Sequence, residues 1–428
     1  MTTEYEFSDS TILWGQYAQS LLVTERTLNA IQSEQTSGQP VGLQMNELMK
    51  DHQDPAILAR RQVIDERHKH LARLLEEHRL NGLILSRPEN LSWLTAASDL
   101  NPGLVVWRHP VFAYVTPTHR MIICDTTQSA RLFEEELFGL GFLLKEFPLA
   151  DGPQAILSNV VSGKQVAWDM RLDDRPSLKA DLYNATQKLS DQERASLRRL
   201  GKMLALCVET TAATFKRNES EREIAAQLVH RMMREGITPI HVQVLSEPRA
   251  RHYRSAAPRH FPVNQWGVIS VTGRRDGLDV SMSRCVAFGT PPLSFIREYE
   301  VAAMAQTTGA FFTRPEESVG VIAPKVRRIL EKHGFADEWG RESSLAGAGR
   351  PANELPSITQ IPNMAVIANH SAWAWQSVVG ASRVTDTIVT DAEGYEVITV
   401  AKHSMWPMME ISVKGQPVRR PSFLKREN

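Results

Sequence analysis

The sequence predicts an α/β protein, in the broader α+β sense, built from two domains with an extension at each end. Its 428 residues exceed what one hydrophobic core usually organises. Hydrophobic residues make up 42% and charged residues 23%, which is typical of a globular chain. Short apolar runs alternate with longer amphipathic stretches of helical period, and this alternation indicates strands covered by helices.

Composition narrows the function classes. Acidic and basic residues balance at 49 each, so no charge excess favours nucleic acid. Three cysteines lie far apart without a Cys-x-x-Cys pair, which indicates a reducing compartment and no cysteine metal site. We find no secretory signal pattern and no apolar run of about 18 residues. We therefore expect a cytoplasmic protein that binds neither nucleic acid nor membrane.

The first half of the chain divides into an extension and a domain. Residues 1–55 are expected to form a helical N-terminal extension with a polar linker. Residues 56–187 are expected to form an α/β domain that opens with a charged helix over 56–79. Its strands are expected at 82–85, 111–114, 121–124 and 166–168.

The second half is expected to form a larger domain over residues 188–412. Two helices begin it, at 189–215 and 219–235, with Ser190 or Asp191 as the first N-cap. A strand at 242–246 and a hairpin at 266–289 follow, and then helices at 297–312 and 319–334. Residues 413–428 are basic and are expected to be a solvated tail.

The hairpin carries the first family motif. Gly277, Ser283-Arg284 and Gly289 keep the frame Asp-x-Gly-x-x-x-x-Gly-x-x-x-Asp-x-Thr-Arg. This frame resembles the metal hairpin of the creatinase/aminopeptidase P/prolidase family, whose fold is called pita-bread. The two family aspartates are Ser270 and Ser281 here, and the first family glycine is Thr272.

Three later motifs show the same resemblance and the same kind of departure. In residues 344–356 the metal histidine position is Ala346 and a second histidine position is Asn353. In residues 364–370 the metal glutamate position is Asn369, and in residues 383–399 the bridging glutamate position is Thr385.

The resemblance implies a creatinase N-terminal-like α/β domain followed by a pita-bread domain, and in most members a dinuclear metal centre. Five ligand positions carry Ser, Ser, Ala, Asn and Thr, and none of these side chains is anionic or an imidazole. We therefore expect neither a metal nor another cofactor. Asp276 and Asp279 lie close by, but a one-residue slip of the strand would turn them to the other face.

His252-Tyr253 resembles the family's His-Tyr segment, and His260 is a competing candidate for that histidine. Creatinase itself uses this histidine as acid and base on a carbon–nitrogen bond without metal. The resemblance thus implies a metal-independent hydrolase or lyase for a small amino-acid-derived substrate, with His252 and Glu354 as catalytic residues, and a homodimer. The expected substrate-binding residues are Tyr253, Ser270, Ser281, Arg284, Asn353, Asn369, His370, Arg383 and Thr385.

Two other functions stay open. A pita-bread domain without its metal can serve as a ligand- or protein-binding module, as in a histone chaperone, and the apolar segment 370–376 offers either a docking surface or core tryptophans. A metallopeptidase with rebuilt ligands such as Asp276, Asp279 and His370 is the third reading.

Overall fold

The computed structural model describes residues 54–100, 110–170, 176–342, 344–350, 366–401 and 405–427. By compactness the chain divides into Met1–Ala59 and Arg60–Asn428. Most of the expected N-terminal extension lies outside the described residues, as do Asn353 and Glu354. Of the first unit the structure describes residues 54–59, where the Asp54 carboxylate accepts the Ala56 N–H (2.8 Å) as helix α3 begins.

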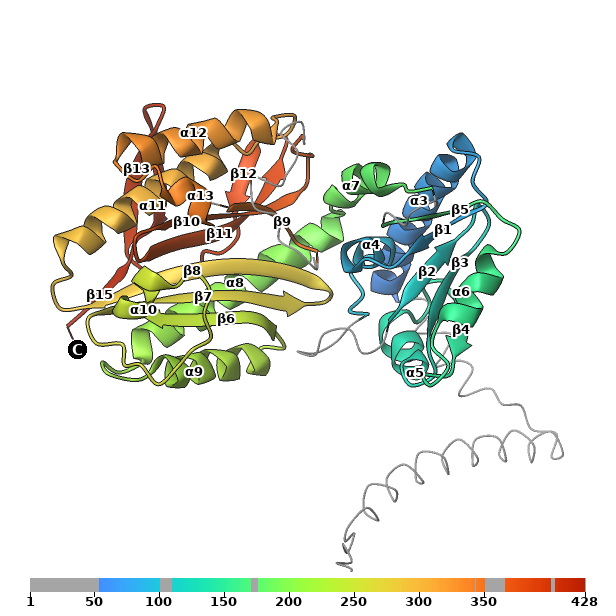
Figure 1. Cartoon of the computed structure of the whole chain (residues 1–428), viewed down its shortest axis with the longest axis horizontal. Helices are drawn as coiled ribbons and strands as arrows, with labels where there is room; N and C mark the ends of the chain where they lie inside the picture. The colour runs from blue at the N-terminus through green and yellow to red at the C-terminus, as the bar shows by residue number, and fades with distance from the viewer. Residues whose placement is uncertain are drawn as a thin grey trace, which may run out of the picture. The chain divides into compact units, whose positions relative to one another are not determined.

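The four strands expected in the N-terminal domain form a sheet together with β4 (Leu143–Phe147), which the sequence did not predict. The order of the five strands is β4-β3-β2-β1-β5 (Figure 1). Strand β1, which lies between β2 and β5, is buried along its whole length, because helices cover both faces of such a sheet. Apolar residues of α6 pack against the buried side chains of this sheet. The elements are α3 (Pro55–Glu77), β1 (Gly82–Leu85), α4 (Pro88–Leu94), β2 (Phe112–Val115), β3 (Arg120–Asp125), α5 (Ser129–Arg131) with a π-helical turn (Leu132–Glu136), β4 (Leu143–Phe147), α6 (Gln154–Val161), β5 (Val166–Trp168) and α7 (Lys179–Gln187).

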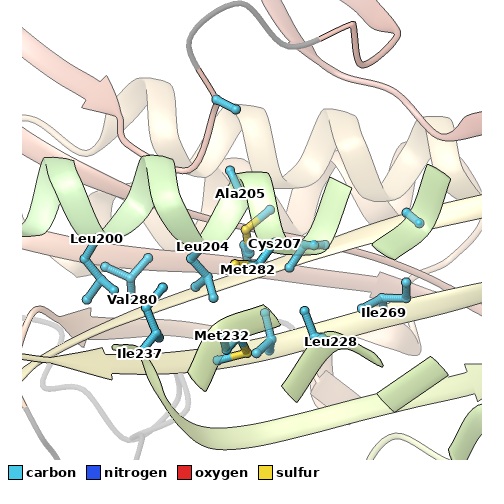
Figure 2. Packing of buried hydrophobic residues seen from close by; sticks show 14 of the residues in the cluster. Leu200, Leu204, Ala205, Cys207, Leu228, Met232, Ile237, Ile269, Val280 and Met282 are labelled. Carbon is cyan, nitrogen blue, oxygen red and sulfur yellow. The ribbon is translucent and has the colours of Figure 1, made fainter. Parts of the chain in front are cut away.

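Helices α8 (Asp191–Thr214) and α9 (Glu221–Arg234) begin with the same device. Ser190 and Ser220 are the N-caps, and each forms a capping box with the glutamate three residues later. The predicted cap at Ser190 is thereby confirmed. The apolar face of α8 packs against strands β7 and β8, and that of α9 packs against β6. Leu204, Met232 and Met282 belong to one buried cluster there (Figure 2).

The predicted hairpin is confirmed as β7 (Trp266–Arg275) and β8 (Leu278–Phe288). Only Asp276 and Gly277 form the turn, and both have positive φ, at 51° and 66°. Gly273 lies inside β7, where an added Cβ would come within 2.7 Å of Ile237. The sheet is completed by β6 (Thr238–Ser246) on one side of the hairpin, and the short helix α10 (Glu247–His252) follows β6.

A second four-stranded sheet, of order β12-β11-β10-β9, packs against the long helix α11 (Leu293–Phe312). Trp373 and Trp375 on β10 are each 1% exposed, so the apolar segment 370–376 supplies core residues and no docking surface. Gly309 of α11 gives the Trp375 ring its space, because an added Cβ would lie 2.5 Å from that ring. The remaining elements are α12 (Val319–Lys332), α13 (Glu338–Glu342), β9 (Ser344–Ala348), β10 (Ala372–Val379), β11 (Ser382–Asp391) and β12 (Gly394–Val397).

The C-terminal residues form strands, whereas the sequence predicts a solvated tail there. Strands β13 (Met408–Val413) and β14 (Gln416–Pro421) make a hairpin, and β15 (Leu424–Arg426) pairs in parallel with the end of β8. Arg420 is only 2% exposed and donates to Asp386 of β11 (2.6 Å). The basic residues of this segment therefore reach buried partners, which a local charge pattern does not reveal.

A buried ion network joins α3 to α8. Glu193, which is 2% exposed, accepts hydrogen bonds from Arg67 of α3 (2.6 Å) and from Arg350 after β9 (2.8 Å). Burial alone would raise the pKa of the Glu193 carboxyl, but the guanidinium groups of Arg350 and Arg67 hold it far below its usual value.

Within the described ranges, no helix combines the length and apolarity that a membrane crossing needs.

Candidate functional site

An open pocket of about 680 Å³ lies beside α10. The structure brings both candidate histidines, His252 and His260, into its wall, although the sequence left the choice between them open. Tyr253 lines the same pocket and is 51% exposed. The other lining residues are Pro248, Arg249, Arg259 and Phe261. Two imidazoles, two guanidinium groups and two aromatic rings thus share one solvent-open site.

The backbone around this pocket is fixed by α9. After α10 the chain returns along the first turn of α9, where the Glu221 N–H donates to Phe261 O (3.0 Å) and the Arg222 N–H to Arg259 O (3.1 Å). The buried Glu221 carboxylate accepts the backbone N–H groups of Ser246 (2.7 Å) and Arg259 (3.0 Å). One carboxylate therefore ties together the start of α10 and the far wall of the pocket.

Arg249 forms the floor of the pocket. Its guanidinium donates to the Glu221 carboxylate, which is fully buried. The same guanidinium lies 5.5 Å from the Tyr253 ring centroid and 5.3 Å from that of Phe261. Because its charge is neutralised by Glu221, Arg249 contributes little free positive charge to the pocket.

His260 has a defined hydrogen-bond partner outside the pocket wall. The Arg222 Nη1 lies 2.8 Å from His260 Nε2. A guanidinium can only donate, so Nε2 is the acceptor and the ring proton is on Nδ1. The His252 ring contacts the Tyr253 ring edge to face, with centroids 6.4 Å apart.

The serine and threonine positions of the metal motifs lie elsewhere, where β7 and β8 meet β11. Ser281 Oγ is hydrogen-bonded to Thr272 Oγ1 across the hairpin (2.7 Å). Thr387 Oγ1 donates to Ser281 O (2.8 Å) and accepts from its N–H (3.1 Å), so this threonine links the two sheets. Thr385 is 4% exposed and donates to Gln376 of β10 (3.1 Å). Ser270, 5% exposed, pairs with Ser283 across the hairpin.

The two arginines of the expected substrate set are engaged inside the fold. Arg284 is 2% exposed and donates to Asp386 (3.0 Å) and to Thr399 O (2.7 Å). Burial works against the charge of Arg284, but Asp386 and Glu209 raise the pKa of its guanidinium. Arg383 donates to Gln243 Oε1 (2.6 Å), and Gln243 pairs with Ser270 across β6 and β7.

The residues of the two remaining motifs are spread further. Asn369 is exposed and His370 half-buried in the turn that precedes β10, and the Leu189 N–H donates to His370 O (2.8 Å). Burial lowers the pKa of His370, and Arg194 and Lys188 lower it further. Asn353 and Glu354 lie outside the described residues, and the backbone of Ala346 pairs with Ala374 in the β9–β10 ladder. The structure therefore does not bring Asn369 or His370 to the His252 pocket, because the pocket is lined by α10 and residues 253–261.

The family resemblance implies a pair of divalent ions at the sheet junction, and the donors found there do not fit them. Such ions need carboxylate or imidazole ligands, whereas Ser270, Ser281 and Thr385 offer neutral hydroxyls. Ser281 and Thr385 are hydrogen-bonded to the side chains of Thr272 and Gln376. Across the part of the chain that the structure describes, no cluster of three or more His, Cys, Asp or Glu side chains is placed to hold a metal ion.

The two sheets, their helices and the hairpin define the pita-bread class of α/β proteins. Residues 195–376 match the family model of metallopeptidase family M24, and they form a domain of this family. Among curated proteins, no sequence matches the chain.

Solved structures show the same fold over most of the chain. The dipeptidase PepE from Mycobacterium ulcerans superposes with a TM-score of 0.66 at 17% identity, over 80% of this chain and 97% of its own. The prolidase from Pyrococcus horikoshii OT3 gives 0.67 at 14% identity, over 79% and 99%. The N-terminal domain of the FACT complex subunit SPT16 from Cicer arietinum (chickpea) gives 0.58 at 12% identity, over 80% and 96%.

Sequence reasoning missed Arg222, Arg249, Arg259 and Phe261 as members of the site. One signal was present for three of them: residues 249–261 read RARHYRSAAPRHF, a dense run of basic and aromatic residues. Arg222 has no such signal, because it reaches His260 only through the packing of α9 against this run.

Proposed function

We propose that the chain is a metal-independent hydrolase or lyase that acts on a carbon–nitrogen bond of a small amino-acid-derived substrate. The observation that carries the proposal is the open pocket that places His252 beside His260 and Tyr253. An imidazole exchanges protons near neutral pH, so it can activate water and return the proton to a leaving nitrogen. His252 is the general acid and base in this proposal.

The proposal places the chemistry in the His252 pocket and not at the sheet junction. Arg284 and Arg383 are buried and bonded within the fold, so we do not assign them to the substrate. Ser270, Ser281 and Thr385 act as neutral links between strands in this proposal. Glu354 and Asn353 remain candidates for orienting the substrate, by the motif resemblance alone.

The test is turnover of a panel of N-acyl amino acids, ureido acids and guanidino acids by the purified chain, with chelator present and with Mn²⁺, Co²⁺ or Zn²⁺ added. We expect turnover that survives chelation and falls by about 100-fold or more in His252→Gln, as for loss of a general acid–base group. His260→Gln serves as the neighbouring comparison. Turnover that needs added metal, or that persists in His252→Gln, would overturn the proposal.

A protein-binding module is the second candidate, and the likeness to a domain of the FACT complex subunit SPT16 favours it. Tyr253 and Phe261, each more than half exposed, are the surface this reading would use. Two results together would favour the binding module over the enzyme: no turnover of any substrate in the panel, and a stoichiometric protein complex that is lost in Phe261→Ser.

A further inference from the structure

We propose that Arg259 and His260, with Arg222 behind them, form a carboxylate-binding subsite of the His252 pocket. The ligand class is an N-acyl amino acid with an apolar side chain. This inference rests on the proposed function for the use of the site, since it names the substrate class of the same pocket.

The charge of the pocket comes from Arg259. The Arg249 charge is offset by the buried Glu221, whereas Arg259 gives only its backbone N–H to that carboxylate. Arg259 is exposed on the pocket wall, and within the described residues its guanidinium forms no ion pair. A guanidinium in this setting favours a planar carboxylate, which it can bind through two parallel hydrogen bonds.

His260 adds a neutral donor. Because Arg222 donates to Nε2, the imidazole keeps its proton on Nδ1 and offers an N–H to the ligand. The nearby carboxylate of Glu223 is engaged in the α9 capping box, where it accepts from the Ser220 N–H and hydroxyl, both at 2.7 Å. Glu223 is therefore held by the helix cap, and the pocket wall presents cations and N–H donors.

The aromatic rings supply the apolar half of the ligand class. Tyr253 and Phe261 are 51% and 52% exposed, and the Arg249 guanidinium lies 5.5 Å and 5.3 Å from the centroids of their rings. Rings that stay this exposed beside cations favour a ligand with an apolar group next to an anionic group. An inorganic anion would use the cations and leave both rings in water.

The test is calorimetric titration of the full chain with three probes: N-acetyl-L-phenylalanine, its C-terminal amide and inorganic phosphate. We expect the acid to bind at least roughly tenfold more tightly than the amide and than phosphate, because the amide lacks the charge and phosphate lacks the ring. Arg259→Gln should lower the affinity for the acid roughly tenfold and leave the affinity for the amide unchanged. Arg327→Gln, at an exposed arginine of α12, is the matched control and should change neither.

Two variants and one spectrum test the role of His260. His260→Asn retains an N–H donor near the Nδ1 position and should bind the acid more tightly than His260→Ala. The ¹⁵N shifts of the His260 ring should report the Nδ1–H tautomer in the wild-type chain and lose this preference in Arg222→Met. Equal binding of acid and amide, unchanged binding in Arg259→Gln, or an Nε2–H tautomer would each overturn the subsite.

The outcome separates this inference from the proposed function. Selective binding of the acid without any turnover would refute the proposed enzymatic function and support the carboxylate-binding subsite. If substrates without a carboxylate are turned over as fast as those with one, the enzymatic function is supported and the carboxylate-binding subsite is refuted.

Discussion

Glu193→Gln is the sharpest test of how the chain is held together. The Glu193 carboxylate is 2% exposed and accepts from Arg67, Arg350 and the Ser190 N–H (2.8 Å). Glutamine keeps the shape but leaves two buried guanidinium groups without an anion. Removing one partner of a buried ion pair costs about 3–5 kcal/mol, and we expect a loss of that size in the free energy of unfolding.

The assay is urea denaturation of wild type and variant followed by circular dichroism. Asp191→Asn is the control, because this carboxylate lies in the same helical turn with its side chain 92% exposed, and it should leave the transition unchanged. Replacing the triad by apolar residues, as in Arg67→Met with Glu193→Leu and Arg350→Met, should recover most of the loss. A loss below about 1 kcal/mol in Glu193→Gln would refute the argument.

The stabilisation of the fold by Glu193 should be lost in acid. The pKa of Glu193 is lowered in the folded state. Its contribution to the free energy of unfolding is therefore fully present above the ordinary glutamate pKa of 4.5 and decreases as the pH falls below that value. The stability difference between wild type and Glu193→Gln should therefore be constant from about pH 5 upward and narrow in acid. A difference that widened in acid would mean that Glu193 is not held by its arginines.

Three further predictions concern packing, thiols and assembly. Gly277→Ala should lower the free energy of unfolding, measured by urea denaturation, more than Gly163→Ala does. Both glycines have φ near +66°, but only at Gly277 would the new Cβ meet Ser98 O, at 2.6 Å; equal costs would refute the contact. Burial raises the pKa of Cys285 to about 12 and of Cys207 to about 11, so a thiol reagent should label them only after unfolding, and its rate on the folded chain should not rise between pH 7 and 9. Light scattering should report a homodimer, as the family resemblance predicts, and a monomer at micromolar concentration would count against it.

Local signals predicted the cap at Ser190 and the hairpin, because their causes are local. Ser190 lies three residues before the glutamate with which it forms a capping box, and the hairpin turn at Asp276-Gly277 needs two residues with positive φ. These features can be recognised in a short window of sequence.

The site was harder to predict because its contacts are long-range. Arg284 was expected to bind substrate or to form a structural salt bridge, and its partner, Asp386, lies 102 residues away in the sequence. Arg222 and His260 are 38 residues apart and meet only when α9 packs beside the return segment. The structure places both candidates for the family histidine, His252 and His260, in one pocket.

The parallel pairing of β15 with β8 bears on how the chain is made. β8 belongs to the candidate hairpin, and its partner Leu424–Arg426 lies far along the chain, where Arg426 also covers the rings of Phe215 and Phe288. On the ribosome, the end of β8 keeps an unpaired edge until synthesis has passed Arg426. Unpaired strand edges invite association with other chains, so a chain cut short before Leu424 should expose this edge and aggregate more readily than the full chain.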